Sequence, residues 1–102
     1  MSNPPLLYRR THAFLRQYED YASGVQEQIE QTLFQIRDYV ERGQAPYGLR
    51  IKSLGRNLYE ARMDIHLRIV FFKGKDIIKF ICIGNHEDVR LCLKNIKDLL
   101  RN

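Results

Sequence analysis

The sequence contains no tryptophan, only two cysteines and only three prolines in 102 residues. A small secreted domain stabilised by disulfides usually carries more cysteines, and without a Cys-x-x-Cys or His-x-x-x-His pairing a zinc site is not expected. We therefore predict that Cys82 and Cys92 are small buried apolar groups. No run is apolar over the length that spans a bilayer, and the N-terminus lacks the pattern of a secretion signal. These absences predict a cytoplasmic protein without membrane contact.

The length and charge of the chain limit the number of domains and the kind of partner to expect. A chain of 102 residues predicts one domain over 1–102. Its net charge of +5 and pI of about 9.4 favour an acidic partner, and nucleic acid is the commonest candidate. A solvated basic surface or an acidic protein partner would explain the same charge. The sequence has no Walker loop and no Gly-x-Gly-x-x-Gly pattern, so we expect no cofactor.

Two helices are expected near the N-terminus, after a short strand. Residues 5–11 favour an edge strand, because proline cannot donate to a sheet. Thr11 is a suitable N-cap for the first helix, and Ser23 with Gln26 forms a capping-box pattern at the start of the second. Apolar residues then recur every three or four positions until Gly43 ends the second helix. With almost no linker between them, these helices should pack as an antiparallel hairpin.

The second half of the chain predicts strands at 57–63, 66–73 and 76–83 and a helix over 86–100. The last strand is apolar on both faces, and strict alternation places its side chains in two sets: Ile77, Ile81 and Ile83 against Ile78, Phe80 and Cys82. The apolar stripe of the final helix either lies across the sheet or forms the seam of a homodimer. The predicted fold is therefore α+β, with an N-terminal helical hairpin packed on a small, mainly antiparallel four-stranded sheet and a C-terminal helix. The basic connection 44–56 is expected to be partly extended.

Charged side chains gather on one face of the strands 57–63 and 66–73. If alternation turns their apolar residues toward the helices, Glu60, Arg62, His66 and Arg68 point to the opposite face. RNA cleavage without a metal needs a base for the 2′-hydroxyl, an acid for the leaving 5′-oxygen and cations for the phosphorane. This cluster holds groups of those types.

Candidate roles follow from the side-chain chemistry. Glu60 and His86 are residue types that serve as an acid–base pair, and Arg62 and Arg68 can hold phosphate oxygens in fork geometry. His86 comes directly after Asn85, a suitable N-cap for the last helix. Further RNA-binding candidates are Arg50, Lys52, Arg56 and His66. Tyr47 lies in the same basic connection, where its ring can stack on a base.

Each of these residues also has a purely structural explanation. Glu60 beside Arg62 and Arg68 fits a cross-strand salt-bridge ladder on a solvated face, and His86 fits an ordinary helix start. The functional interpretation depends on several observations that agree: a candidate base and two arginines lie on neighbouring strands, and the protein is basic.

Four segments of the sequence resemble the RelE/ParE toxin superfamily of bacterial toxin–antitoxin systems. They are Lys52-Ser-Leu54 before Gly55, Leu58-Tyr-Glu-Ala-Arg62, Leu67-Arg-Ile-Val-Phe71 and Ile83-Gly-Asn-His-Glu-Asp-Val89. The resemblance covers most of the chain. It implies a RelE-like fold and a cognate antitoxin that wraps the toxin and blocks its site.

The RelE-like branch of this superfamily contains mRNA interferases. The resemblance therefore implies metal-independent cleavage of mRNA, often in the ribosomal A site, leaving a 2′,3′-cyclic phosphate and a 5′-hydroxyl. Arg68 matches the family's phosphate-binding arginine, Arg62 a basic position on the preceding strand, and His86 a histidine that some members carry. Some members have lysine where Glu60 stands, and the tyrosine that some place near the C-terminus has no counterpart here. The alternatives are a ParE-like gyrase inhibitor and an inactive member that only binds nucleic acid or an antitoxin.

Overall fold

The computed structural model describes residues 5–101 and contains a five-stranded sheet in the order β1-β5-β4-β3-β2. The strands are β1 (Leu7–Arg10), β2 (Lys52–Gly55), β3 (Leu58–Arg62), β4 (Arg68–Lys73) and β5 (Ile77–Gly84). β1 pairs in parallel with β5, and the other pairs are antiparallel. The predicted α+β class, the mainly antiparallel sheet and the edge position of the first strand are confirmed. The predicted number of four strands is wrong, because part of the basic connection forms β2.

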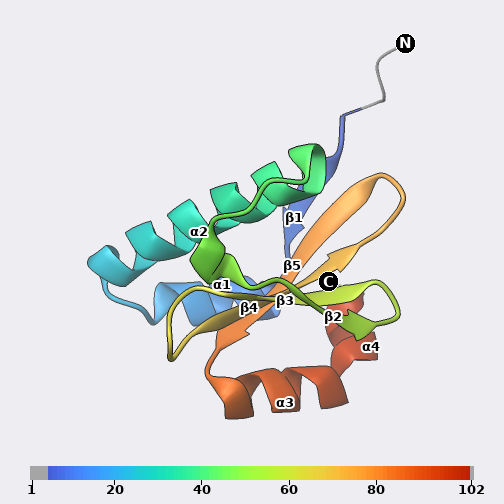
Figure 1. Ribbon diagram of the computed structural model, residues 1–102. Coiled ribbons are helices and arrows are strands. Elements are labelled where there is room, and N and C mark those ends of the chain that lie inside the picture. The colour runs from blue at the N-terminus through green and yellow to red at the C-terminus, as the bar shows by residue number, and fades with distance from the viewer. Residues whose placement is uncertain (1–4, 102) are drawn as a thin grey trace.

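Helices cover both faces of this sheet (Figure 1). They are α1 (His12–Glu19), α2 (Ser23–Arg42), the 3₁₀ helix η1 (Tyr47–Leu49), α3 (His86–Lys94) and α4 (Ile96–Leu100). One core cluster joins α1, α2 and η1 to one face, and a second joins α3 and α4 to the other. No helix within residues 5–101 is long and apolar enough to cross a membrane.

The chain reverses between α1 and α2, as predicted (Figure 1). The capping box predicted at the start of α2 is wrong. Ala22 is the N-cap, and the Gln26 side chain donates to the Tyr18 carbonyl at 2.9 Å instead of turning back toward Ser23. The connection of a few residues brings the end of α1 within reach of Gln26. Gly43 ends α2 with a φ of 74°, a left-handed conformation that glycine adopts without steric cost.

A bulge in β5 decides which side chains reach each face. The β4–β5 register shifts by one residue at Ile81. Ile81 and Cys82 therefore both face α3, whereas Phe80 and Ile83 face the helical hairpin. The strict alternation predicted for 76–83 is wrong at Cys82 and Ile83, because a bulge moves every later side chain to the other face.

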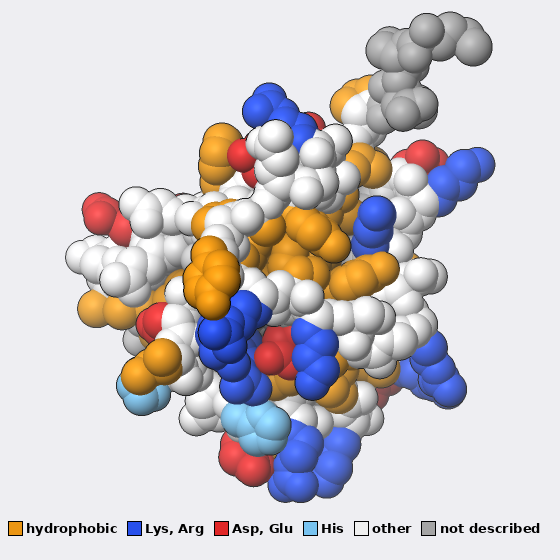
Figure 2. Space-filling view, in the orientation of Figure 1, with side chains coloured by type: hydrophobic (Ala, Val, Ile, Leu, Met, Phe, Trp, Pro, Cys, Tyr) orange, Lys and Arg blue, Asp and Glu red, His pale blue; other side chains and the backbone are white. Residues whose placement is uncertain are grey.

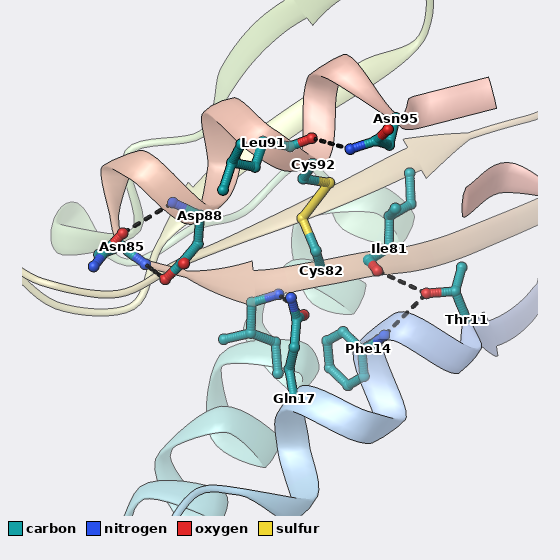
Figure 3. The surroundings of a disulfide bond; sticks show 11 residues. Thr11, Phe14, Gln17, Ile81, Cys82, Asn85, Asp88, Leu91, Cys92 and Asn95 are labelled. Atoms are coloured by element: carbon teal, nitrogen blue, oxygen red, sulfur yellow. Dashed lines mark hydrogen bonds between the residues drawn. A yellow bond between two sulfur atoms is a disulfide. The ribbon is translucent and has the colours of Figure 1, made fainter. Parts of the chain in front are cut away.

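α1 completes the edge of β5 that the short strand β1 leaves unpaired (Figure 3). The Thr11 hydroxyl donates to the Ile81 carbonyl at 2.6 Å and accepts from the Phe14 N–H at 3.1 Å. Gln17 Oε1 accepts from the Ile83 N–H at 2.8 Å. The predicted N-cap role of Thr11 is confirmed. The same hydroxyl also satisfies a carbonyl at the bulge, so this buried side chain has both a donor and an acceptor partner.

Cys82 and Cys92 form a disulfide between β5 and α3 (Figure 3). Their burial is as predicted, at 2% and 5% exposure. Their treatment as separate apolar groups is wrong. The bulge turns Cys82 toward α3, and the reversal of the chain after Gly84 lays α3 over β5.

The predicted helix 86–100 is broken at Asn95 into α3 and α4. The Asn95 side chain donates to the Leu91 carbonyl at 3.0 Å, and its φ of −110° and ψ of 20° are not helical. An asparagine side chain that bonds its own backbone competes with helix continuation. The break lets α4 fold back onto the sheet, where Lys79 donates to the Leu100 carbonyl at 2.8 Å. The apolar stripe is thus packed on the sheet and needs no homodimer to cover it.

Candidate functional site

A basin of about 350 Å³ lies on the α3 side of the sheet. Its lining comes from β2, β3, β4 and the two residues before β2: Arg50, Ile51, Lys52, Glu60, Arg62 and Arg68. α3 and α4 pack over the neighbouring apolar part of this face, which includes Leu58, Val70 and Ile81. The basin therefore occupies the part of the face that the C-terminal helices do not cover.

Strand register fixes the order of charges across the basin. Lys52 of β2 lies opposite Glu60 of β3, and Arg62 of β3 lies opposite Arg68 of β4. Opposite charges in such cross-strand positions stabilise a sheet, whereas like charges destabilise it. The Arg62–Arg68 pair is therefore an arrangement that folding alone does not favour, and it suits an anion bound between the two guanidinium groups.

Arg68 is the centre of a three-residue contact. Its Nε lies 3.3 Å from Glu60 Oε1, and its Nη1 lies 3.0 Å from His86 Nδ1. Both members of the ion pair are shielded, with 16% of the Glu60 side chain and 21% of the Arg68 side chain exposed. Since arginine can only donate, Nδ1 of His86 accepts here and the ring proton is assigned to Nε2. His86 is thus neutral in this arrangement, and its Nε2–H remains available to a ligand.

The start of α3 positions His86. Asn85 and Asp88 form a reciprocal capping box, with hydrogen bonds of 2.9 Å in both directions (Figure 3). A Cβ added at Gly84 would lie 2.3 Å from the Asp88 Cβ, so only glycine allows α3 to approach β5 this closely. Gly84 also lies opposite Arg68 in the sheet. Sequence reasoning found this cap but missed the packing role of Gly84, because the close approach becomes visible only when α3 is placed on the sheet.

The basin carries an excess of positive charge, with four cations and one carboxylate among its lining residues. Within residues 5–101, Arg50, Lys52 and Arg62 form no ion pair with an acidic side chain. Figure 2 looks onto this surface, where Lys and Arg side chains surround an acidic one and a histidine lies beside them. In the same described part of the chain, no three His, Cys, Asp or Glu side chains are grouped to hold a metal ion. The arrangement is suited to binding phosphate through cationic side chains.

Two of the predicted RNA-binding residues lie outside the basin. Arg56 is in the tight β2–β3 turn, where it has a φ of 52°. His66 is in the β3–β4 turn, and its backbone N–H donates to Asp64 Oδ1 at 2.7 Å. The predicted strand 66–73 begins only at Arg68, because Asp64 caps the turn through the N–H groups that follow it. The prediction that His66 shares the strand face of Glu60 and Arg68 is therefore wrong.

A second pocket, of about 320 Å³, lies between β1 and α2. Its charged groups are engaged with acidic partners. Arg10 forms two hydrogen bonds with Glu30, at 2.6 and 2.9 Å, and Arg37 Nε donates to Glu41 at 2.9 Å. Burial raises the pKa of the Tyr8 hydroxyl, and the hydrogen bond that it donates to the Glu41 carboxylate raises this pKa further. This pocket lacks the unpaired cations of the basin, so we consider the basin the better candidate for an anionic ligand.

Comparisons with known proteins give a match in fold. No family model matches the sequence, and no curated protein is significantly similar to it. A copper-bound mutant toxin from Helicobacter pylori matches with a TM-score of 0.63 and 10% identity, over 82% of this chain and 98% of its own. A chain of the E. coli DinJ–YafQ complex matches with a TM-score of 0.62 and 9% identity, over 82% and 97%. A chain of the RelB–RelE antitoxin–toxin complex from Methanococcus jannaschii matches with a TM-score of 0.58 and 16% identity, over 83% and 95%. The chain therefore has the RelE-like toxin fold that its sequence motifs indicate.

Proposed function

We propose that this protein is the toxin of a toxin–antitoxin system and a metal-independent endoribonuclease that cleaves mRNA in association with the ribosome, in the cytoplasm. The observation that carries the proposal is the like-charge pair Arg62–Arg68 in the basin, with Glu60 and His86 both in contact with Arg68. A purely structural face would pair these arginines with acids. Here the one carboxylate of the basin forms an ion pair with Arg68, and Arg62 has no acidic partner within residues 5–101, which leaves it able to bind a phosphodiester.

Substrate binding begins with the cations. Arg62 and Arg68 hold the non-bridging oxygens of the scissile phosphate, and Arg50 and Lys52 contact neighbouring phosphates. A phosphate on Arg68 competes with His86 Nδ1 for the guanidinium, which frees that nitrogen to take a proton. The guanidinium groups stabilise the negative charge that grows on the phosphorane, and this stabilisation is largest in the transition state.

The chemical step is an internal transfer. The Glu60 carboxylate removes the proton of the 2′-hydroxyl, and the 2′-oxygen forms a bond to phosphorus. The bond from phosphorus to the 5′-oxygen breaks, and protonated His86 supplies the proton that this oxygen needs. The products are a 2′,3′-cyclic phosphate and a 5′-hydroxyl, with one proton gained by Glu60 and one lost by His86.

The proposed protein partner is a cognate antitoxin. Two of the matched structures are complexes of a toxin with its antitoxin: DinJ–YafQ and RelB–RelE. The positive basin gives an acidic segment of such a partner a place to bind and to block the site.

Primer extension on translating mRNA, after expression of the protein, tests the proposal. We expect new 5′ ends with the wild type, and a loss of cleavage of about 10²-fold or more for Arg68→Ala and His86→Ala. Arg42→Ala, at the exposed end of α2, is the matched control and should cleave like the wild type. Chelation of metals during cleavage in vitro should leave the rate unchanged.

Other results would contradict the proposal in distinct ways. Normal cleavage by both site variants would show that the site is elsewhere. Growth arrest with intact mRNA and damaged DNA would favour a gyrase inhibitor of the ParE type. If the protein is expressed without an antitoxin and is not toxic, it is an inactive member of the superfamily.

A further inference from the structure

We infer that Tyr47 is a binding residue of the same site and that its ring stacks on a base of single-stranded RNA next to the phosphate held in the basin. This inference rests on the proposed function and names a contact that the acid–base cluster does not include. Three observations support it: the Tyr47 ring is exposed, the turn that carries it is anchored to the core, and the charged residues that follow it in the chain, up to Arg56, are cations.

Tyr47 is the most exposed of the large hydrophobic residues between positions 5 and 101, at 92%. An exposed aromatic residue is by itself ordinary, so its surroundings decide what it means. Phe34 on α2 is also exposed, at 65%, but it borders the second pocket, where arginines are paired with acids. Tyr47 instead precedes the basin residues Arg50, Ile51 and Lys52 in the chain.

The turn that carries Tyr47 is anchored to the core. Leu49 of η1 is only 2% exposed and belongs to the cluster beneath α2. Pro46 precedes the turn with a φ of −62°, and its carbonyl accepts from the Leu49 N–H at 3.1 Å. The backbone at Tyr47 is therefore fixed before any ligand arrives, which lowers the entropic cost of a stacking contact.

The sequence on both sides of Tyr47 carries charge of one sign. Between Glu41 and Glu60 the sequence has no acidic residue, while Arg50, Lys52 and Arg56 lie in this interval. In Figure 2 an exposed hydrophobic side chain over η1 borders the cluster of Lys and Arg side chains. An exposed ring beside unpaired cations is the combination by which proteins bind single-stranded nucleic acid, because the cations follow the backbone and the ring takes a base.

Arg50 links the ring to the basin. It follows η1 directly and has a φ of 43°, a left-handed conformation that is uncommon outside glycine. One 3₁₀ turn separates Tyr47 from Arg50, a rise of about 6 Å. A nucleotide whose phosphate contacts Arg50 thus has the Tyr47 ring within reach of its base.

The chain has no tryptophan, so Tyr47→Trp creates a protein with a single tryptophan at the proposed contact. The probe is a 2′-O-methyl RNA oligonucleotide, which lacks the attacking hydroxyl and cannot be cleaved. Binding, followed separately by the anisotropy of a dye on the RNA, should quench the fluorescence of the introduced indole. Removing the base at one position of the oligonucleotide should abolish most of the quenching. Phe34→Trp is the matched control, and its emission should not change.

Affinity gives the second measurement. We expect Tyr47→Ala to weaken RNA binding about 10- to 100-fold, the range that base–aromatic stacking commonly contributes, and Tyr47→Phe to bind like the wild type. Phe34→Ala should also bind like the wild type. Binding by Tyr47→Ala equal to that of the wild type, unquenched fluorescence on bound RNA, or no RNA binding at all would overturn the inference. A protein that binds and quenches but does not cleave unmodified RNA would overturn the proposed nuclease and leave Tyr47 as a binding residue.

Discussion

At the scale of single residues, the site is organised around Arg68. This arginine contacts both candidate proton-transfer groups, Glu60 at 3.3 Å and His86 at 3.0 Å, and faces Arg62 across the strands. In the proposed mechanism Glu60 is the base, and its contact with Arg68 fixes the carboxylate within the basin. Under the proposed function, a substrate phosphate would compete with both groups for the same guanidinium.

Glu60→Gln is the sharpest test of that assignment. The amide keeps the shape of the side chain but cannot act as a base, so we expect single-turnover cleavage to fall by about 10² to 10⁴-fold. Affinity for 2′-O-methyl RNA should stay the same or increase, because a negative charge beside the phosphate is removed. Glu27→Gln, on the exposed surface of α2, is the control. Cleavage by Glu60→Gln at the wild-type rate would exclude Glu60 as the base.

At the scale of elements, the sequence predicts most of the architecture but not its irregularities. Hydrophobic periodicity locates the long helix and the apolar strand correctly, because both extend over several repeats. It indicates β2 only as a partly extended connection, and it does not reveal the bulge at Ile81 or the break at Asn95. The bulge and the break depend on tertiary or local hydrogen bonds that compete with a regular pattern, and periodicity carries no information about such bonds.

The same limit applies to the candidate site. Alternation alone is enough to bring Glu60, Arg62 and Arg68 together, because the strands that carry them are adjacent in the sequence. The contact of His86 with Arg68 depends on how α3 packs, and no local pattern fixes that. The position predicted for His66 is wrong because the Asp64 side chain lengthens the turn at the expense of the strand.

Gly84→Ala tests how the packing of α3 positions His86. The added Cβ would lie 2.3 Å from the Asp88 Cβ, so the start of α3 must move away from β5. We expect a loss of about 1–3 kcal/mol in the free energy of unfolding, measured by urea denaturation, and reduced cleavage as His86 leaves Arg68. Gly24→Ala is the control, since a Cβ there meets nothing within 4 Å and a helix favours alanine. Unchanged stability and activity in Gly84→Ala would show that α3 adapts without cost.

The ion pair between Arg10 of β1 and Glu30 of α2 predicts that stability depends on pH. The hydrogen bonds from Arg10 lower the pKa of Glu30 in the folded protein, below its ordinary value of 4.5. A lowered folded-state pKa stabilises the protein above about pH 4.5, and this stabilisation is lost as the pH falls through the folded value. The side chains of Arg10 and Glu30 are 33% and 44% exposed, so solvent screening limits the effect to about 1 kcal/mol or less.

Glu30→Gln should therefore unfold more easily than the wild type at pH 7, and the difference should shrink at pH values below the folded-state pKa of Glu30. Urea denaturation of both proteins at neutral and acidic pH measures it, with Glu27→Gln as the control variant. A difference that stays constant across this range would show that the carboxylate charge of Glu30 does not contribute.

At the scale of the whole molecule, the sheet separates the larger hydrophobic core from the candidate site. The core beneath α1 and α2 holds the fold, while the opposite face is shared between the packing of α3 and α4 and the open basin. On that opposite face the disulfide fixes α3, which carries His86, to the interior strand β5. The state of the two sulfurs therefore bears on stability and on the site together.

Reduction of the Cys82–Cys92 bond should destabilise the protein measurably. The bond closes a loop with a sequence separation of 10 residues, and the chain-entropy relation gives about 3 kcal/mol for a loop of that size. Urea denaturation with and without a phosphine reductant should show this loss in the wild type and none in the double variant Cys82→Ala, Cys92→Ala.

Because thiols are kept reduced in the cytoplasm, the reduced protein is the relevant one for the proposed function. If α3 keeps its place through Val89 and the capping box at Asn85, the reduced protein will still cleave RNA. Cleavage that disappears on reduction, while the protein stays folded, would instead show that the disulfide holds His86 in position.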